Sequence, residues 1–131
     1  MATATTTIFA PELFIRPGVT DISFYSRAFG AVELRRFSND DGSIHVAELS
    51  IGGAMFHLHE EVLRKKERSP DSYPGITTKI GLFVPDADAV MKTVLEAGAT
   101  LVSPAQSFDY GYRQGEVKDP FGHIWMIQEK L

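Results

Sequence analysis

The feature that most constrains this 131-residue chain is an internal repeat whose spacing is about half the chain length. Gly30-Ala31 recurs 68 residues later as Gly98-Ala99, and Pro17 recurs at the same spacing as Pro85. Gly53 and Gly122 lie 69 residues apart, so one inserted residue reconciles the matches. Either half alone buries too little surface to be stable. The repeat therefore predicts two similar halves that fold together.

Each half carries the pattern of one strand, one helix and three further strands. Apolar residues at helical spacing predict helices over 19–29 and from Ala87 onward, where Asp86 is a good N-cap. Extended patterns bounded by turn residues predict the strands. The expected strands are 8–15, 31–38, 44–50 and 54–60 in the first half, and 79–84, 100–104, 111–119 and 123–129 in the second.

A charged segment with two prolines, residues 60–75, separates the halves and is expected to be an exposed linker. We interpret residues 1–131 as a single domain, with module 1 at about 8–59 and module 2 at about 77–129. The predicted fold class is α+β. Two βαβββ modules would form an eight-stranded, mostly antiparallel cupped sheet with the helices outside. Such a concave face is suited to holding a ligand.

Composition narrows the classes of partner. The chain has 13 Lys and Arg against 17 Asp and Glu, a net charge of −4, which argues against a nucleic-acid-binding protein. The absence of cysteine excludes disulfides and thiolate chemistry. The start MATATTTIFAP has no basic region followed by a long apolar run, and no stretch is long enough to cross a membrane. We expect a cytoplasmic protein that binds neither nucleic acid nor membrane.

Three segments carry a family resemblance: FYSRAFGA at 24–31, DDGSIHVAELSIGGAMFHL at 40–58 and VKDPFGHIWMI at 117–127. With them the chain resembles the vicinal oxygen chelate superfamily of glyoxalase I, bleomycin-resistance proteins and extradiol dioxygenases. DPFGHIW is the most specific piece, and the resemblance covers nearly the whole chain. It implies the glyoxalase/bleomycin resistance/dihydroxybiphenyl dioxygenase fold and a homodimer. Sheet edges that would otherwise stay open also favour a homodimer.

The resemblance also places a metal site. Catalytic members hold a divalent metal with side chains from the first and last strand of each half, which correspond here to Ala10, His57, Lys79 and Met126. Only His57 is a competent ligand, because alanine has no donor, lysine is protonated and a thioether is too soft. We therefore predict no cofactor. A displaced site for a divalent metal, built from Glu12, His57 and His59, stays open as an alternative.

Alternation along the strands predicts which side chains face the cup. Leu13, Phe56 and Trp125 are expected to pack under the helices, and their neighbours to face the cavity. Tyr110 and Tyr112 lie in a loop that borders the cavity in relatives, where they would stack on a flat ligand or pack at the edge, and Arg113 would pair with an anion. The candidate ligand-binding residues are Glu12, Phe14, Met55, His57, His59, Lys79, Phe83, Tyr110, Tyr112, Arg113 and Met126.

Three functions fit these residues. The favoured one is a metal-free protein that binds, and in that way sequesters, a small molecule in a cup lined by aromatic and methionine side chains. The alternative is a metal-dependent lyase, isomerase or dioxygenase with altered ligands. The third is a metal-free enzyme with Glu12 or His57 as general base. A plain polar patch, with a Glu12–Lys79 ion pair, is the structural alternative to all three.

Overall fold

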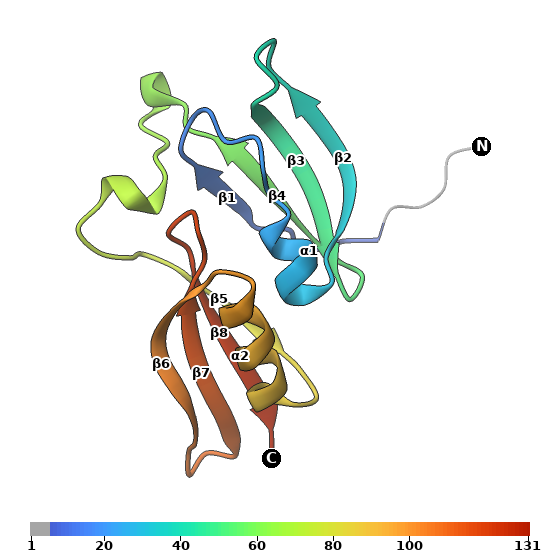
Figure 1. Ribbon diagram of the computed structural model, residues 1–131, viewed down its shortest axis with the longest axis vertical. Helices are drawn as coiled ribbons and strands as arrows, with labels where there is room; N and C mark the ends of the chain where they lie inside the picture. Colours follow the sequence, from blue (N-terminus) through green and yellow to red (C-terminus); the bar gives the residue numbers. More distant parts are fainter. Residues whose placement is uncertain (1–5) are drawn as a thin grey trace.

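A computed structural model describes residues 6–131, so the start of the N-terminal stretch considered above lies outside the described residues. The first module consists of β1 (Glu12–Ile15), α1 (Phe24–Phe29), β2 (Val32–Ser38), β3 (Ile44–Ile51) and β4 (Ala54–Glu60). The second repeats this order as β5 (Lys79–Phe83), α2 (Ala87–Glu96), β6 (Thr100–Ser107), β7 (Tyr112–Lys118) and β8 (Ile124–Lys130). Both modules are visible, one above the other, in Figure 1. The predicted pair of βαβββ modules is confirmed.

The eight strands are divided between two four-stranded mixed sheets and do not join in one sheet within the chain. The strand orders are β1-β4-β3-β2 and β5-β8-β7-β6. In each sheet the first strand of the module runs parallel to the last, and the other neighbours are antiparallel. His57 of β4 lies opposite Glu12 and Glu48, and Met126 of β8 lies opposite Gly81 and Glu116. His57 and Met126 therefore occupy equivalent positions, as the repeat predicts.

The two helices lie against each other at the junction of the modules, not on the outside of the single chain (Figure 1). The Arg27 guanidinium of α1 donates to the Ala97 carbonyl at the end of α2, at 2.9 Å. A shared core fills the junction, where Tyr25, Phe56 and Trp125 are almost completely buried. Each sheet thus has one face toward the helices and the core and one that no helix covers, which we call the helix-free face.

A buried carboxylate ties the second module to the first. Asp119, in the turn before β8, accepts hydrogen bonds from the Tyr25 hydroxyl at 2.5 Å and from the Trp125 indole N–H at 2.9 Å. It also accepts from the backbone N–H groups of Phe121 and His123. Burial and the negative charge of Asp119 raise the pKa of Tyr25 well above its usual value, so this hydroxyl stays a donor.

The connection between the modules is held by specific hydrogen bonds and is not only an exposed linker. It contains two short 3₁₀ turns, Leu63–Lys65 and Pro70–Ser72. Glu61 holds it in place, because its carboxylate accepts from the Ser69 N–H at 2.9 Å and from the hydroxyls of Ser69 and Ser72. Ser69 is buried as a result.

Two predicted boundaries need correction. The first helix begins at Phe24 and not at Val19, because the Val19 carbonyl is used by the Ile44 N–H at 2.7 Å and is not free for a helical bond. The first strand begins at Glu12, and Ile8 and Phe9 lie exposed before it. Among residues 6–131, no helix is long and apolar enough to cross a bilayer.

Candidate functional site

The helix-free face of the first sheet carries a row of titratable side chains. Glu12, His57 and Glu48 lie side by side on β1, β4 and β3. The Glu12 carboxylate is 3.8 Å from His57 Nδ1, and the Glu48 carboxylate is 4.0 Å from His57 Nε2. Nε2 is shielded from solvent and has no hydrogen-bond partner within the described residues. The imidazole is therefore flanked by two carboxylates, one at each ring nitrogen.

A second row runs beside the first. Phe14 lies opposite His59, and their rings meet edge to face at 5.8 Å. His59 Nδ1 donates to the Glu60 carbonyl at 2.7 Å, and His45 contacts the Glu60 carboxylate at 2.9 Å. The structure thus brings Glu12, Phe14, His57 and His59 together on one face, as alternation predicts.

These side chains do not fit a metal ion. Glu12 and Glu48 approach opposite nitrogens of one imidazole, so they cannot converge with it on a single cation. His59 has one ring nitrogen occupied by a backbone carbonyl. No group of three or more His, Asp or Glu side chains in residues 6–131 is arranged to hold a metal. Ala10, the first position that the resemblance assigns, lies before β1 begins.

The helix-free face of the second sheet has a different chemistry. Lys79 Nζ lies 2.8 Å from the Glu116 carboxylate, so the suggested Glu12–Lys79 ion pair is replaced by one within this sheet. The half-buried Met126 is next to Glu116 on the neighbouring strand. The Gln128 amide packs over Gly81, where an added Cβ would come within 2.8 Å of it. Its oxygen accepts from the Gln114 amide at 2.5 Å.

A continuous row of aromatic rings borders this face. Phe83 meets Tyr112 edge to face at 5.3 Å, and Tyr112 meets Tyr110 edge to face at 5.7 Å. Tyr110 stacks on Phe108, with ring centroids 5.3 Å apart and planes 10° from parallel. The Tyr110 hydroxyl donates to the Gln114 amide oxygen, which links the rings to the Gln114–Gln128 pair. Phe83 and Tyr110 are more than half exposed, so this row presents free ring surface.

Arg113, the predicted partner of an anion, is paired with a carboxylate of the chain itself. Its guanidinium forms a forked ion pair with Asp88 of α2, at 3.0 to 3.2 Å, and donates to the Ser107 hydroxyl. The hydrogen bonds to Asp88 raise the pKa of Arg113. Its charge is therefore used to hold β7 against the helix.

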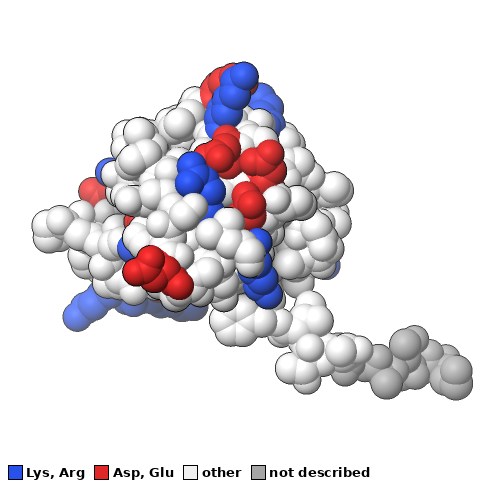
Figure 2. Space-filling model, turned by 90° about the horizontal axis from the view of Figure 1, so that it is seen from below, with Lys and Arg blue, Asp and Glu red and all other residues white. Residues whose placement is uncertain are grey.

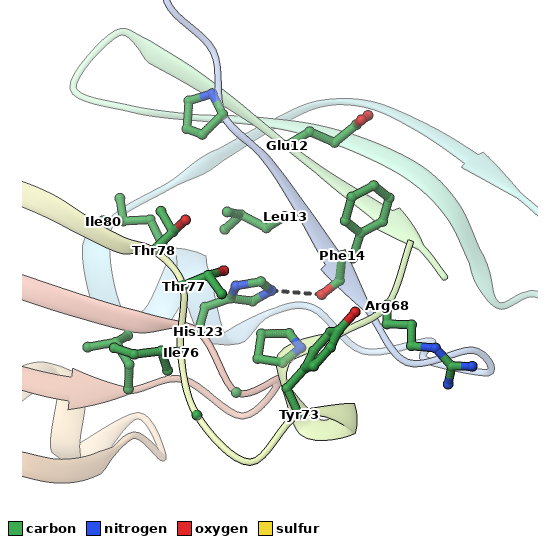
Figure 3. A pocket seen from close by; sticks show the side chains of 15 residues that line it. Glu12, Leu13, Phe14, Arg68, Tyr73, Ile76, Thr77, Thr78, Ile80 and His123 are labelled. Atoms are coloured by element: carbon green, nitrogen blue, oxygen red, sulfur yellow. Dashed lines mark hydrogen bonds between the residues drawn. The ribbon is translucent and has the colours of Figure 1, made fainter. Parts of the chain in front are cut away.

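A cleft runs between the two modules, along β1 and β5. Its larger part has a volume of about 550 Å³ and is lined mainly by apolar side chains, including Leu13, Ile80 and Trp125. Met55 and Lys79 lie at its border. A smaller part of about 220 Å³ continues toward Thr77, Thr78 and His123 (Figure 3). There His123 Nε2 donates to the Phe14 carbonyl at 2.7 Å, a direct link between the modules (Figure 3).

Sequence reasoning identified most of these residues, and alternation along the last strand also predicted that Gln128 faces the cavity, but it missed three that matter. Phe108, Gln114 and Glu48 belong to the two helix-free faces. Phe108 precedes the predicted strand, and only its spacing of two from Tyr110 hinted at a shared face. Glu48 and Gln114 occupy the outward positions of predicted strands, and the rule of alternation applied to β3 and β7 would have found them. Trp125 is buried, as predicted.

The surface gives little sign of a polyanion partner. On the face seen in Figure 2, basic and acidic side chains are interspersed and no continuous basic region is present. The expectation that the chain does not bind nucleic acid stays a prediction.

The chain matches one protein-family model and is similar to several known proteins. The family model "Glyoxalase/Bleomycin resistance protein/Dioxygenase superfamily" matches residues 21–127. The uncharacterised protein Mb0911c of Mycobacterium bovis is 37% identical over 125 residues, which cover 93% of this chain and 82% of the relative. TioX from Micromonospora sp. ML1 is 28% identical, with a TM-score of 0.68, and the match covers 96% of this chain and 100% of TioX.

A more distant solved structure shows the same fold. A glyoxalase/bleomycin resistance protein/dioxygenase family enzyme from Burkholderia phytofirmans PsJN is 20% identical, with a TM-score of 0.72. The match covers 93% of this chain and 97% of the enzyme.

Proposed function

This chain belongs to the glyoxalase/bleomycin resistance protein/dioxygenase superfamily, and we propose that it is a metal-free binding protein for planar aromatic small molecules. The observation that carries the proposal is the exposed row of Phe83, Tyr112, Tyr110 and Phe108 beside the Gln114–Gln128 amide pair. Aromatic rings contribute stacking surface at low entropic cost, and fixed amides orient polar groups. Sequestration of such a molecule is the simplest role for this activity.

The first module contributes an acidic counterpart. Glu12 and Glu48 lie beside His57, and no Lys or Arg of the described chain comes within 4.0 Å of either carboxylate. A planar molecule that carries a positive charge suits either surface, because aromatic rings and carboxylates each attract cations. Proflavine, a fluorescent planar cation, is therefore an appropriate probe.

The alternative, a metal-dependent lyase, isomerase or dioxygenase, has less support. Its ligands would have to come from Glu12, His57 and His59, whose arrangement does not fit a metal. Binding of proflavine that is unchanged after treatment with a chelator supports the metal-free proposal. Stoichiometric uptake of nickel, zinc, manganese or ferrous iron would overturn it.

The direct test is titration of the protein with proflavine by fluorescence anisotropy. Tyr112→Ala removes the ring that contacts both Phe83 and Tyr110, and we expect binding to weaken roughly three- to tenfold. Leu63→Ala, an exposed change in the linker, is the control and should bind like the wild type. Equal affinity of the Tyr112 variant and the wild type would show that the aromatic row is not the site.

A further inference from the structure

The Gln114–Gln128 amide pair is part of a longer chain of hydrogen bonds across the second sheet. The chain begins at Tyr110, in the loop between β6 and β7, whose hydroxyl donates to the Gln114 amide oxygen. Gln114 and Gln128 lie directly opposite each other on β7 and β8, and the Gln114 amide N–H donates to the Gln128 oxygen at 2.5 Å. Because an amide has one accepting end and one donating end, this order leaves Nε2 of Gln128, a donor, as the free end of the chain.

This free amide N–H is held in place and open to a ligand. Gln128 is only 6% exposed, and its Nε2 packs over Gly81, where an added Cβ would come within 2.8 Å. Within the described residues Nε2 donates to no protein acceptor and, unlike His57 Nε2, it keeps contact with solvent. A deeply packed amide with one unused donor is a group that the acceptor of a ligand can satisfy.

The groups around the Gln128 amide favour a ligand that accepts hydrogen bonds. Phe83 lies opposite Gln128 on β5 and is about half exposed, and the Lys130 ammonium lies 5.1 Å from the centre of its ring. The nearby acceptors are already in use. The amide oxygens of Gln114 and Gln128 accept within the chain of hydrogen bonds, and the Glu116 carboxylate is held in an ion pair. A ring that lies against Phe83 therefore meets donors at its edge.

We propose that the second-module face selects planar ring systems with a carbonyl acceptor at the ring edge, which receives the hydrogen bond from Gln128 Nε2 while the ring lies against Phe83. The isoalloxazine ring of a flavin is a ligand of this class, because it is planar and carries two carbonyl groups at one end. A ring without an acceptor leaves the Gln128 N–H covered and unpaired, which opposes binding. This inference names a ligand class for the proposed function and rests on that function.

Proflavine provides the contrast that the test needs. The edge of this cation carries N–H donors, so it stacks on the exposed rings but cannot accept the hydrogen bond from Gln128. Riboflavin, a soluble and fluorescent flavin, uses both stacking and the hydrogen bond. Comparison of the two ligands therefore separates acceptor recognition from stacking.

Gln128→Glu is the sharpest variant, because it replaces the free amide NH₂ group with a carboxylate oxygen and keeps an acceptor for Gln114. Both ligands are titrated by fluorescence at pH 8, where a carboxylate is ionised. We expect riboflavin to bind at least about tenfold more weakly and proflavine to bind more tightly, since a carboxylate repels a carbonyl oxygen and attracts a cation. Gln106→Glu, the same change at an exposed position two strands away on β6, is the control and should alter riboflavin affinity less than about twofold.

Tyr110→Phe tests the chain of hydrogen bonds while Gln128 itself stays unchanged. It keeps the ring of the aromatic row and removes the hydroxyl that orients the Gln114 amide. Tyr110 is 63% exposed, so the fold should tolerate the change. We expect riboflavin affinity to fall roughly threefold more than proflavine affinity, because the amides lose their fixed order.

The outcomes separate acceptor recognition from the proposed function. An equal loss of both ligands in Gln128→Glu, or no loss of riboflavin, would overturn acceptor recognition and leave aromatic binding intact. A wild-type protein that binds proflavine but not riboflavin would do the same. If Gln128→Glu does not fold, the comparison of the two ligands on Tyr110→Phe decides in the same way. A wild-type protein that binds neither ligand nor other planar aromatic compounds would instead overturn the proposed function.

Discussion

At the scale of single residues, Asp119 joins the two modules through buried hydrogen bonds. It is 3% exposed and accepts from two buried side-chain donors on different modules, Tyr25 and Trp125. The aspartate and the tryptophan of DPFGHIW, the most specific motif in the sequence, are thus hydrogen-bonded to each other at the junction of the modules. His123 of the same motif links the modules through the Phe14 carbonyl.

Asp119→Ala should lower the free energy of unfolding by roughly 3–5 kcal/mol, because it leaves the Tyr25 hydroxyl and the Trp125 N–H buried without an acceptor. Urea denaturation measures the change. Asp40→Asn, at an exposed position of the turn between β2 and β3, is the control and should stay within about 0.5 kcal/mol of the wild type. A cost below about 1 kcal/mol for the Asp119 variant would show that the junction tolerates the loss.

At the scale of elements, the sequence predicted order and type better than boundaries. The repeat and the alternation of apolar residues predicted both modules and the buried sides of β1, β4 and β8. The apolar spacing of Val19 and Ile22 indicated a longer helix, yet both residues are buried from a non-helical segment. These two residues are apolar because they are buried in the core, and not because they belong to a helix. Composition similarly predicted a solvated linker. It could not reveal the hydrogen bonds that Ser69 and Ser72 donate to Glu61, because these residue types are equally common in exposed loops.

The linker gives the fold an acid-sensitive element. The hydrogen bond from the Ser69 N–H, with those from the Ser69 and Ser72 hydroxyls, lowers the pKa of Glu61 in the folded state. A lowered folded-state pKa means that the ionised carboxylate stabilises the fold above its unfolded pKa. This contribution is lost as the pH falls through the folded-state pKa.

Glu61→Gln should therefore lower the thermal midpoint at pH 7 by a few degrees at most, since the Glu61 side chain is only partly buried, with a smaller difference at pH 3. Calorimetry of both proteins at the two pH values measures this. A difference that is the same at both pH values would show that the carboxylate charge does not hold the linker.

At the scale of the whole molecule, the sequence did not predict how the parts of the candidate site are arranged in space. Alternation identified the side chains on both helix-free faces, but it could not place one face relative to the other. That arrangement depends on the shared core of Tyr25, Phe56 and Trp125, which turns the helices inward and the candidate site residues outward. The pairing of Lys79 with Glu116 and of Arg113 with Asp88 likewise depends on neighbours that are distant in sequence.

The most direct test of the account is a map of backbone amide shifts in the NMR spectrum as proflavine is added to isotope-labelled protein. We predict that the largest changes fall on the helix-free faces, at His57, Tyr112 and Gln128 and their neighbours on β4, β7 and β8. Changes confined to the buried core, such as Val94 of α2 and Ile127 of β8, or an unchanged spectrum at saturating proflavine, would contradict the account.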